Sequence, residues 1–124
     1  MRHLIEEYEV QTETKITTKK QIMKFRKAAK EAKINLCSKD NRCSVEVFIE
    51  NVADGNDFDY EISKATFERC IKKGFLDKFI PLIEDTLTMA NTTKDGINKV
   101  LLVGGSSHIP VINELLRKFF PESV

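Results

Sequence analysis

Apolar residues recur at the spacing of an α-helix in several stretches of this chain. The clearest stretch begins after Thr17 or Thr18, either of which could cap a helix. Its apolar positions lie three or four residues apart, as one face of a helix requires. They are Ile22, Phe25, Ala29, Ala32 and Leu36. A shorter stretch of the same kind predicts that residues 1–10 form the end of a helix.

The second half of the chain also carries helical spacing. Ser63 is placed to cap a helix that begins at Lys64. The inner face of that helix is predicted to carry Phe67, Cys70 and Ile71. Gly74 and Pro81 predict breaks or kinks, and an apolar stripe then continues to Ala90.

Alternation of apolar and polar residues predicts a β-hairpin over residues 43–62. Asp54 and Gly55 form its turn, because both favour the positive φ angles that a two-residue hairpin turn requires. Phe48 interrupts the polar face, which predicts that this side is partly covered. Residues 39–42 before the hairpin read as a polar turn.

Near the C-terminus, the continuous apolar run from Val100 to Val103 predicts a strand covered on both faces. Gly104 and Gly105 end the run and allow a tight turn. A helix follows, with Pro110 tolerated in its first turn. Its apolar positions are Val111, Ile112, Leu115, Leu116, Phe119 and Phe120. Free N–H groups between a strand and a helix can bind an anion, although a plain turn is the alternative.

Together these elements predict an α+β fold with an antiparallel hairpin, flanking helices and a strand–Gly-Gly–helix segment. The half-polar hairpin and the doubly covered strand belong to different sheets. We therefore expect the neighbours of that strand to lie outside this sequence. A length of 124 residues with 41% hydrophobic and 31% charged residues suits one modest globular domain or part of a larger one.

Charge, hydropathy and cysteine content argue against several classes of function. A net charge of +1 gives no overall bias toward nucleic acid. The lysine-rich face of the helix after Thr18 reads as a solvated surface, with nucleic-acid contact as the alternative. No apolar run approaches membrane-spanning length. The odd number of cysteines, which are Cys37, Cys43 and Cys70, predicts free thiols and a reducing compartment. They form no Cys-x-x-Cys pair, so structural zinc is not expected.

One string is more specific than these patterns. Residues 103–110 read Val-Gly-Gly-Ser-Ser-His-Ile-Pro, and Phe119-Phe120-Pro121 follows. This resembles the adenosine-and-phosphate loop of the heat-shock protein 70 (DnaK-type) chaperones. Further stretches of the chain are similar to the same family, so the resemblance covers nearly all of it. They are Arg26 to Ser38, Gly55 to Phe58, Ile62 to Phe67 and Leu82 to Ala90.

The resemblance implies that residues 1–124 are part of lobe II of the family's ATPase domain. Residues from 1 to about 75, with the hairpin 43–62, would form the outer subdomain. Residues from about 76 to 124 would form part of the inner subdomain, with the adenosine and phosphate loop at residues 103–110. In the family, adenosine lies between this loop and one face of the long helix matched by Thr18 to Cys37.

The resemblance also implies the nucleotide-binding residues. They are Lys30, Lys33, Ile34, Cys37, Gly104, Gly105, Ser106, His108 and Ile109. No catalytic and no metal-binding residue is expected in this chain, because the family's other phosphate loops, its magnesium-organising aspartates and its catalytic lysine lie outside the matched region.

Several positions depart from the family. Lys30 stands where the family has a glutamate that holds the ribose, and Cys37 replaces a serine that helps hold the base. Ile34 and His108 stand where two arginines sandwich the adenine ring, a role that suits the stacking of guanidinium on a ring. The alternatives are a solvated Lys33, packing roles for Ile34 and Cys37, and a His108 that only flanks the helix.

For the full-length protein, the resemblance implies ATP or ADP with Mg²⁺, although no nucleotide is expected to be bound to this chain alone. Its expected partners are nucleotide exchange factors and co-chaperones, with client polypeptides bound only through a substrate domain absent from this sequence. Neither nucleic acid nor a membrane is expected. The cytoplasm is the expected location, and an organelle stays open.

Three hypotheses follow for the full-length protein. The first is an ATPase chaperone of this family. The second is a divergent co-chaperone or exchange-factor scaffold with weak or absent ATP turnover, because both adenine-clamping arginines are replaced. The third is a sugar kinase or an actin relative, against which the string Ser-Ser-His-Ile-Pro argues.

Overall fold

The computed structural model describes residues 1–38 and 42–121, so residues 39–41 of the predicted polar turn lie outside the described residues. The chain divides into two compact units, Met1–Phe67 and Glu68–Val124. Helices and one antiparallel hairpin make up the fold, which confirms the predicted α+β class. Within the described ranges, none of the helices combines the length and apolar character needed to cross a membrane.

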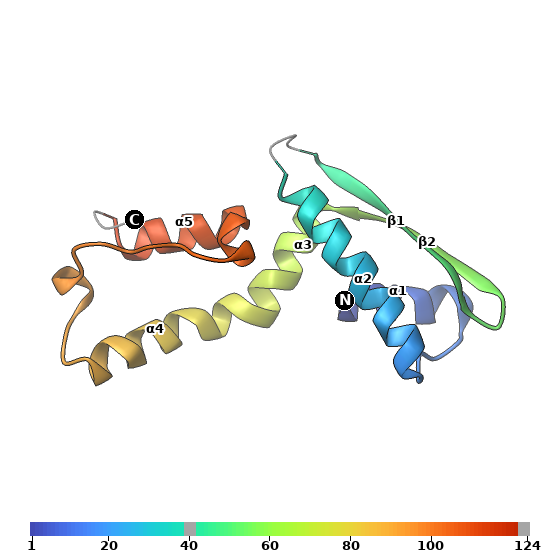
Figure 1. Cartoon of the computed structure of the whole chain (residues 1–124), viewed down its shortest axis with the longest axis horizontal. Helices are drawn as coiled ribbons and strands as arrows, with labels where there is room; N and C mark the ends of the chain where they lie inside the picture. The colour runs from blue at the N-terminus through green and yellow to red at the C-terminus, as the bar shows by residue number, and fades with distance from the viewer. Residues whose placement is uncertain (39–41, 122–124) are drawn as a thin grey trace. The chain divides into compact units, whose positions relative to one another are not determined.

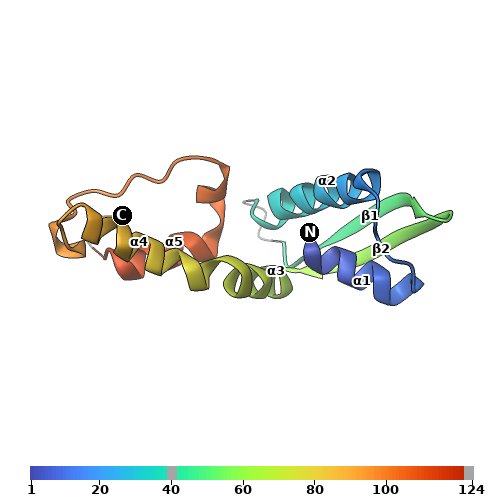
Figure 2. The ribbon, with the colours of Figure 1, turned by 90° about the horizontal axis from the view of Figure 1, so that it is seen from below.

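Unit 1 is built from two helices and the hairpin. In chain order these are α1 (Arg2–Thr12), α2 (Lys19–Leu36), β1 (Ser44–Ala53) and β2 (Asn56–Ser63), drawn in Figures 1 and 2. Thr18 caps α2: its side chain accepts the backbone N–H of Gln21, whose own side chain accepts the N–H of Thr18 at 2.9 Å. This reciprocal capping box resolves the choice between Thr17 and Thr18.

The hairpin follows the predicted alternation. Val47 pairs with Tyr60 and Ile49 with Phe58 in an antiparallel register. Asp54 and Gly55 connect the strands with φ angles of 52° and 79°, as the predicted two-residue turn requires.

A bulge interrupts the register near the turn. Residues 50–52 of β1 stand opposite Asp57 alone, and Asn51 has a φ of 46°. Lys24 of α2 donates from Nζ to the carbonyl oxygens of Glu50, at 2.9 Å, and Asn51, at 2.6 Å. Asp57 Oδ1 accepts the Asn51 N–H at 2.7 Å. Lys24 therefore stabilises the bulge, which differs from the solvated role predicted for this lysine.

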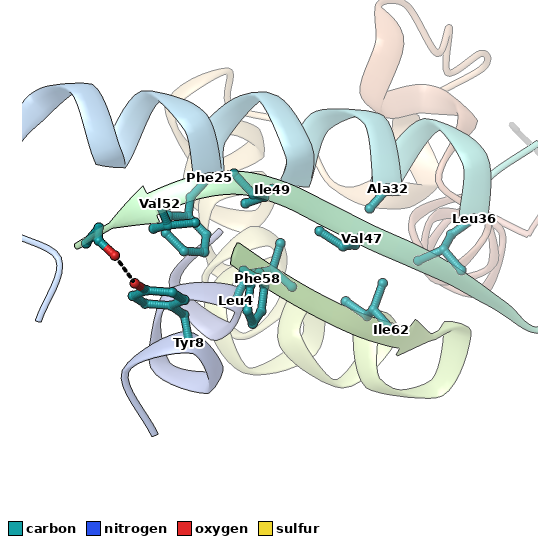
Figure 3. Close-up of a cluster of buried hydrophobic side chains, with 11 residues drawn as sticks. Leu4, Tyr8, Phe25, Ala32, Leu36, Val47, Ile49, Val52, Phe58 and Ile62 are labelled. Atoms are coloured by element: carbon teal, nitrogen blue, oxygen red, sulfur yellow. Dashed lines mark hydrogen bonds between the residues drawn. The ribbon is translucent and has the colours of Figure 1, made fainter. Parts of the chain in front are cut away.

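The core of unit 1 lies on the inner face of the hairpin, where α1 and α2 cover it (Figure 3). Phe58 of β2 is fully buried and contacts the rings of Tyr8 from α1 and Phe25 from α2. The Tyr8 hydroxyl donates to the carbonyl oxygen of Ala53 at 3.5 Å. The buried members of this core are Leu4, Tyr8, Phe25, Ala32, Leu36, Val47, Ile49, Val52, Ala53, Phe58 and Ile62.

Helix α3 (Lys64–Ile71) begins in unit 1 and ends in unit 2. Ser63 Oγ accepts the Thr66 N–H at 3.1 Å, which confirms Ser63 as its cap. Phe67 packs against the core of unit 1. Cys70, by contrast, is exposed, so its predicted place on the inner face is wrong.

Unit 2 continues with a π-helical segment, η1 (Lys72–Leu76), and α4 (Asp77–Met89). Gly74 lies in the π-helical turn, which is the irregularity that this glycine predicts. Pro81 lies inside α4 and does not end it. Two short 3₁₀ segments, η2 (Lys94–Gly96) and η3 (Gly105–His108), precede α5 (Pro110–Phe119).

The apolar run from Val100 to Val103 is not a strand in the structure. Leu101 is 72% exposed and Val103 is 85% exposed, whereas Val100 and Leu102 are half-buried. The physical reason is that a strand needs a hydrogen-bonded neighbour, and the only paired strands in the described residues are β1 and β2.

Candidate functional site

The Gly-Gly turn has a backbone that only glycine adopts readily. Gly104 has φ 87° and ψ 166°, a region that is essentially restricted to glycine. Its carbonyl oxygen accepts the N–H of Ser107 at 3.1 Å and the Ser107 hydroxyl at 2.6 Å. These two bonds close the turn that opens η3, so the loop has a defined shape without any ligand.

An asparagine fastens this loop to the following helix. Asn113 Nδ2 donates to the carbonyl oxygen of Ser107 at 2.6 Å and to that of Ile109 at 3.4 Å. Pro110 occupies the first turn of α5, as predicted. Sequence reasoning missed Asn113, although a side-chain amide one turn into a helix after a serine-rich loop could have drawn attention to it.

The loop residues differ in burial. Gly104, Gly105, Ser106 and His108 are exposed, so their backbone and side chains are open to a ligand. Ile109 is only 6% exposed and belongs to the buried residues of unit 2. Its side chain therefore packs, and a role in binding would fall to its backbone.

The four predicted helix residues share one face of α2. Lys30, Lys33 and Ile34 lie in its last two turns, and Cys37 caps its C-terminus by donating its N–H to the carbonyl oxygen of Lys33 at 3.1 Å. Lys30 is exposed, Ile34 is 54% exposed, and Lys33 and Cys37 are half-buried. The face thus offers two ammonium groups and one open apolar side chain.

The predicted site residues form two sets, because the helix residues belong to unit 1 and the loop residues to unit 2. The loop set suits an anion: a glycine turn and the start of a helical segment expose N–H groups that lack intrahelical acceptors. The helix set suits phosphate or a flat ring at Lys30, Lys33 and Ile34. No group of three or more His, Cys, Asp or Glu residues in the described ranges could hold a metal ion.

Comparison with known proteins bears on the whole chain. The family model described as "Hsp70 protein" matches residues 1–124. Heat shock 70 kDa protein 14 of Homo sapiens is 37% identical over 100 residues, which is 81% of this chain and 19% of the human protein. The Bos taurus protein of the same name is 40% identical over 78 residues, 63% of this chain and 15% of that protein.

A relative from Dictyostelium discoideum has a similar sequence identity to this chain. Heat shock 70-related protein 5 of Dictyostelium discoideum is 36% identical over 97 residues, which cover 78% of this chain and 18% of that protein. The chain thus spans less than a fifth of the length of these relatives.

Proposed function

The chain belongs to the Hsp70 family, and from this we propose that it is part of the ATPase domain of an Hsp70-type chaperone and forms one wall of the adenosine site. The observation that carries the proposal is the family match over residues 1–124 together with the glycine-only backbone at Gly104. The site belongs to the full-length protein, to which this chain contributes helix α2 and the loop before α5.

On the phosphate side, Gly104, Gly105 and Ser106 bring backbone N–H groups toward the nucleotide. A Cβ built at Gly104 or Gly105 would meet nothing within 4 Å, so the space beside both glycines is open to a ligand. Lys30 and Lys33 add positive charge from α2, which favours phosphate as a point-charge interaction.

On the base side, the proposed site is weaker than the family pattern. Ile34 offers only dispersion to an adenine ring, and a neutral His108 stacks without a fixed charge. Cys37 lies at the C-terminal end of the same helix face. Mg²⁺ bound with ATP would neutralise charge on the phosphates, and the residues that position it belong to other parts of the full-length protein.

We assign partner binding to the hairpin. In this proposal, nucleotide exchange factors and co-chaperones contact the outer face of β1 and β2, whose alternating polar residues are exposed. Client polypeptides bind elsewhere in the full-length protein.

A second function has its own supporting observation. Ile34 and His108 together leave the base without a guanidinium partner, which favours a co-chaperone or exchange-factor scaffold that turns over ATP slowly or not at all. ATP turnover by the full-length protein separates the two functions: steady hydrolysis favours the chaperone, and binding without hydrolysis favours the scaffold.

The proposed site can be tested by a calorimetric titration of the full-length protein with MgATP. Gly104→Ala forces a Cβ into a φ of 87° and should weaken ATP binding about tenfold or more, a loss of roughly 1–3 kcal/mol from strained backbone. Gly55→Ala is the matched control, because Gly55 has a φ of 79° in the hairpin turn and also has nothing within 4 Å. Equal ATP affinity in both variants would contradict the proposed site.

A further inference from the structure

The outer face of the hairpin carries charge of one sign. Its exposed acidic residues are Glu46, Glu50, Asp57, Asp59 and Glu61. No lysine or arginine occurs between Ser44 and Ser63. The helices α1 and α2 pack on the opposite, inner face. We call these five acidic residues and Phe48 the acidic outer face.

Phe48 is the one apolar side chain on this face. It is 63% exposed, although the sequence pattern predicted partial cover on this side. It follows Glu46 and precedes Glu50 at alternate positions of β1, and it pairs in register with Asp59 of β2. A large aromatic ring held open among carboxylates has the composition of an interface anchor, since aromatic residues are enriched at the centres of protein interfaces.

Repulsion between carboxylates lowers the stability of the hairpin. Glu46 pairs directly with Glu61 across the two strands, and like charges directly opposite each other are destabilising. Neither is joined to a cation by any salt bridge in the described residues. A positively charged partner would relieve this repulsion.

Two of the five carboxylates already accept hydrogen bonds within the hairpin. Asp57 accepts the Asn51 N–H, and Glu61 accepts the Ser44 hydroxyl at 2.5 Å. Glu46, Glu50 and Asp59 make no side-chain hydrogen bond or ion pair within the part of the chain that the structure describes. These three surround Phe48 and are available to a partner.

We propose that the acidic outer face docks a protein partner that packs an apolar patch bordered by lysine or arginine against Phe48. This deepens the partner-binding part of the proposed function, on which it rests, by stating the chemistry of the partner. Charge complementarity selects a basic partner, and the exposed ring supplies the buried anchor that surface carboxylates alone do not provide.

The probe for this proposal is a helical peptide of about 18 residues, with leucine on one face and lysine elsewhere. A second peptide has glutamate in place of every lysine. Each is titrated into the ¹⁵N-labelled 124-residue chain, whose amide spectrum reports both the fold of each variant and the residues that respond. We expect the lysine peptide to shift resonances of residues 46–50 and 57–61, and the glutamate peptide to shift none of them.

Three variants then test the assignment. Phe48→Ser should weaken binding of the lysine peptide by roughly tenfold or more, as removal of a hot-spot residue does. The combination Glu46→Gln, Glu50→Gln and Asp59→Asn should also weaken it and should remove most of its salt dependence. Met89→Ser is the matched control, because Met89 is an exposed apolar residue of unit 2, and it should bind as the unchanged chain does.

Unchanged affinity in both the Phe48 and the carboxylate variants would overturn the proposal, as would equal binding of the glutamate peptide. A second arm repeats the titrations with purified nucleotide exchange factors. If these bind and ignore Phe48→Ser, the proposal here fails while the proposed exchange-factor surface stands. If none binds any form of the chain, the exchange-factor surface fails, and the peptide arm still decides the chemistry of this face.

Discussion

Phe58 is the residue on which the core of unit 1 converges. Its ring centroid lies 5.7 Å from that of Tyr8, 5.6 Å from that of Phe25 and 5.9 Å from that of Tyr60. We predict that Phe58→Ala lowers the free energy of unfolding of unit 1 by about 3–5 kcal/mol, because it opens a cavity among these rings. Tyrosine emission during urea unfolding is the measurement, since both tyrosines, Tyr8 and Tyr60, lie in unit 1 and the chain has no tryptophan.

Phe48→Ala is the matched control for that prediction. It removes the same atoms from the opposite face of the hairpin, where the ring is 63% exposed. It should change the free energy of unfolding by less than about 0.5 kcal/mol. A comparable loss in the two variants would show that the assignment of inner and outer faces is wrong.

Lys24 illustrates what sequence reasoning misses at the scale of one residue. Its position among the lysines of α2 predicts a solvated side chain, but Nζ donates to two carbonyl oxygens at the β1 bulge. We predict that Lys24→Met lowers the free energy of unfolding by about 1–2 kcal/mol, since those carbonyls lose a charged donor. Lys27→Met, on the exposed side of the same helix, should cost less than about 0.5 kcal/mol. Equal free energies of unfolding for the two variants would exclude a stabilising role of Lys24 at the bulge.

At the scale of single elements, the hairpin places two negative charges, those of Glu46 and Glu61, directly opposite each other. Replacing Glu46 by lysine would turn the Glu46–Glu61 pair into an attractive one. We predict that Glu46→Lys raises the free energy of unfolding by about 0.2–1 kcal/mol, the range of cross-strand pairs. Glu46→Gln should give a smaller gain, because it removes repulsion without adding attraction. The measurement is tyrosine emission during urea unfolding. A lower free energy of unfolding in the lysine variant would contradict the proposed repulsion.

The elements that the sequence predicts well are those specified by local chemistry. Thr18 with Gln21 specifies the start of α2, and Asp54 with Gly55 specifies the hairpin turn. The predicted strand from Val100 to Val103 fails because pairing depends on a neighbour rather than on the run itself. The bulge at residues 50–52 was not predictable either, since Lys24, far away in sequence, stabilises it.

In the candidate site, too, some features follow from local sequence and others depend on packing. The turn at Gly104 follows from the Gly-Gly pair, and the shared face of Lys30, Lys33 and Ile34 follows from helical spacing. The burial of Ile109 and the bonds from Asn113 depend on how α5 packs onto the loop. Local pattern therefore predicted the loop and the helix face of the proposed site but did not separate packing residues from exposed ones.

At the scale of the whole molecule, the 124-residue chain alone should not hydrolyse ATP. Phosphoryl transfer needs Mg²⁺, a positioned water and charged groups around the γ-phosphate, and the family resemblance assigns these to regions outside this chain. The measurement is phosphate release from ATP by the purified chain against a buffer blank. Release that disappears when Gly105 is replaced would contradict this expectation.

The central proposal is that this chain forms one wall of the adenosine site. In this wall, Ile34 and His108 replace the two arginines that sandwich the adenine ring in the family pattern. Restoring them with Ile34→Arg and His108→Arg together should strengthen ATP binding by the full-length protein. At about 0.5–2 kcal/mol for each cation on a ring, the gain is roughly tenfold to a thousandfold. Val10→Arg is the control, because it adds a cation at an exposed position of α1, away from the proposed site.

The most direct measurement is a calorimetric titration of MgATP into the full-length protein, its double arginine variant and the Val10→Arg control. The account predicts weak binding by the unchanged protein and by the control, and binding at least about tenfold tighter by the double variant. Equal affinities in all three proteins would contradict the adenosine wall at Ile34 and His108.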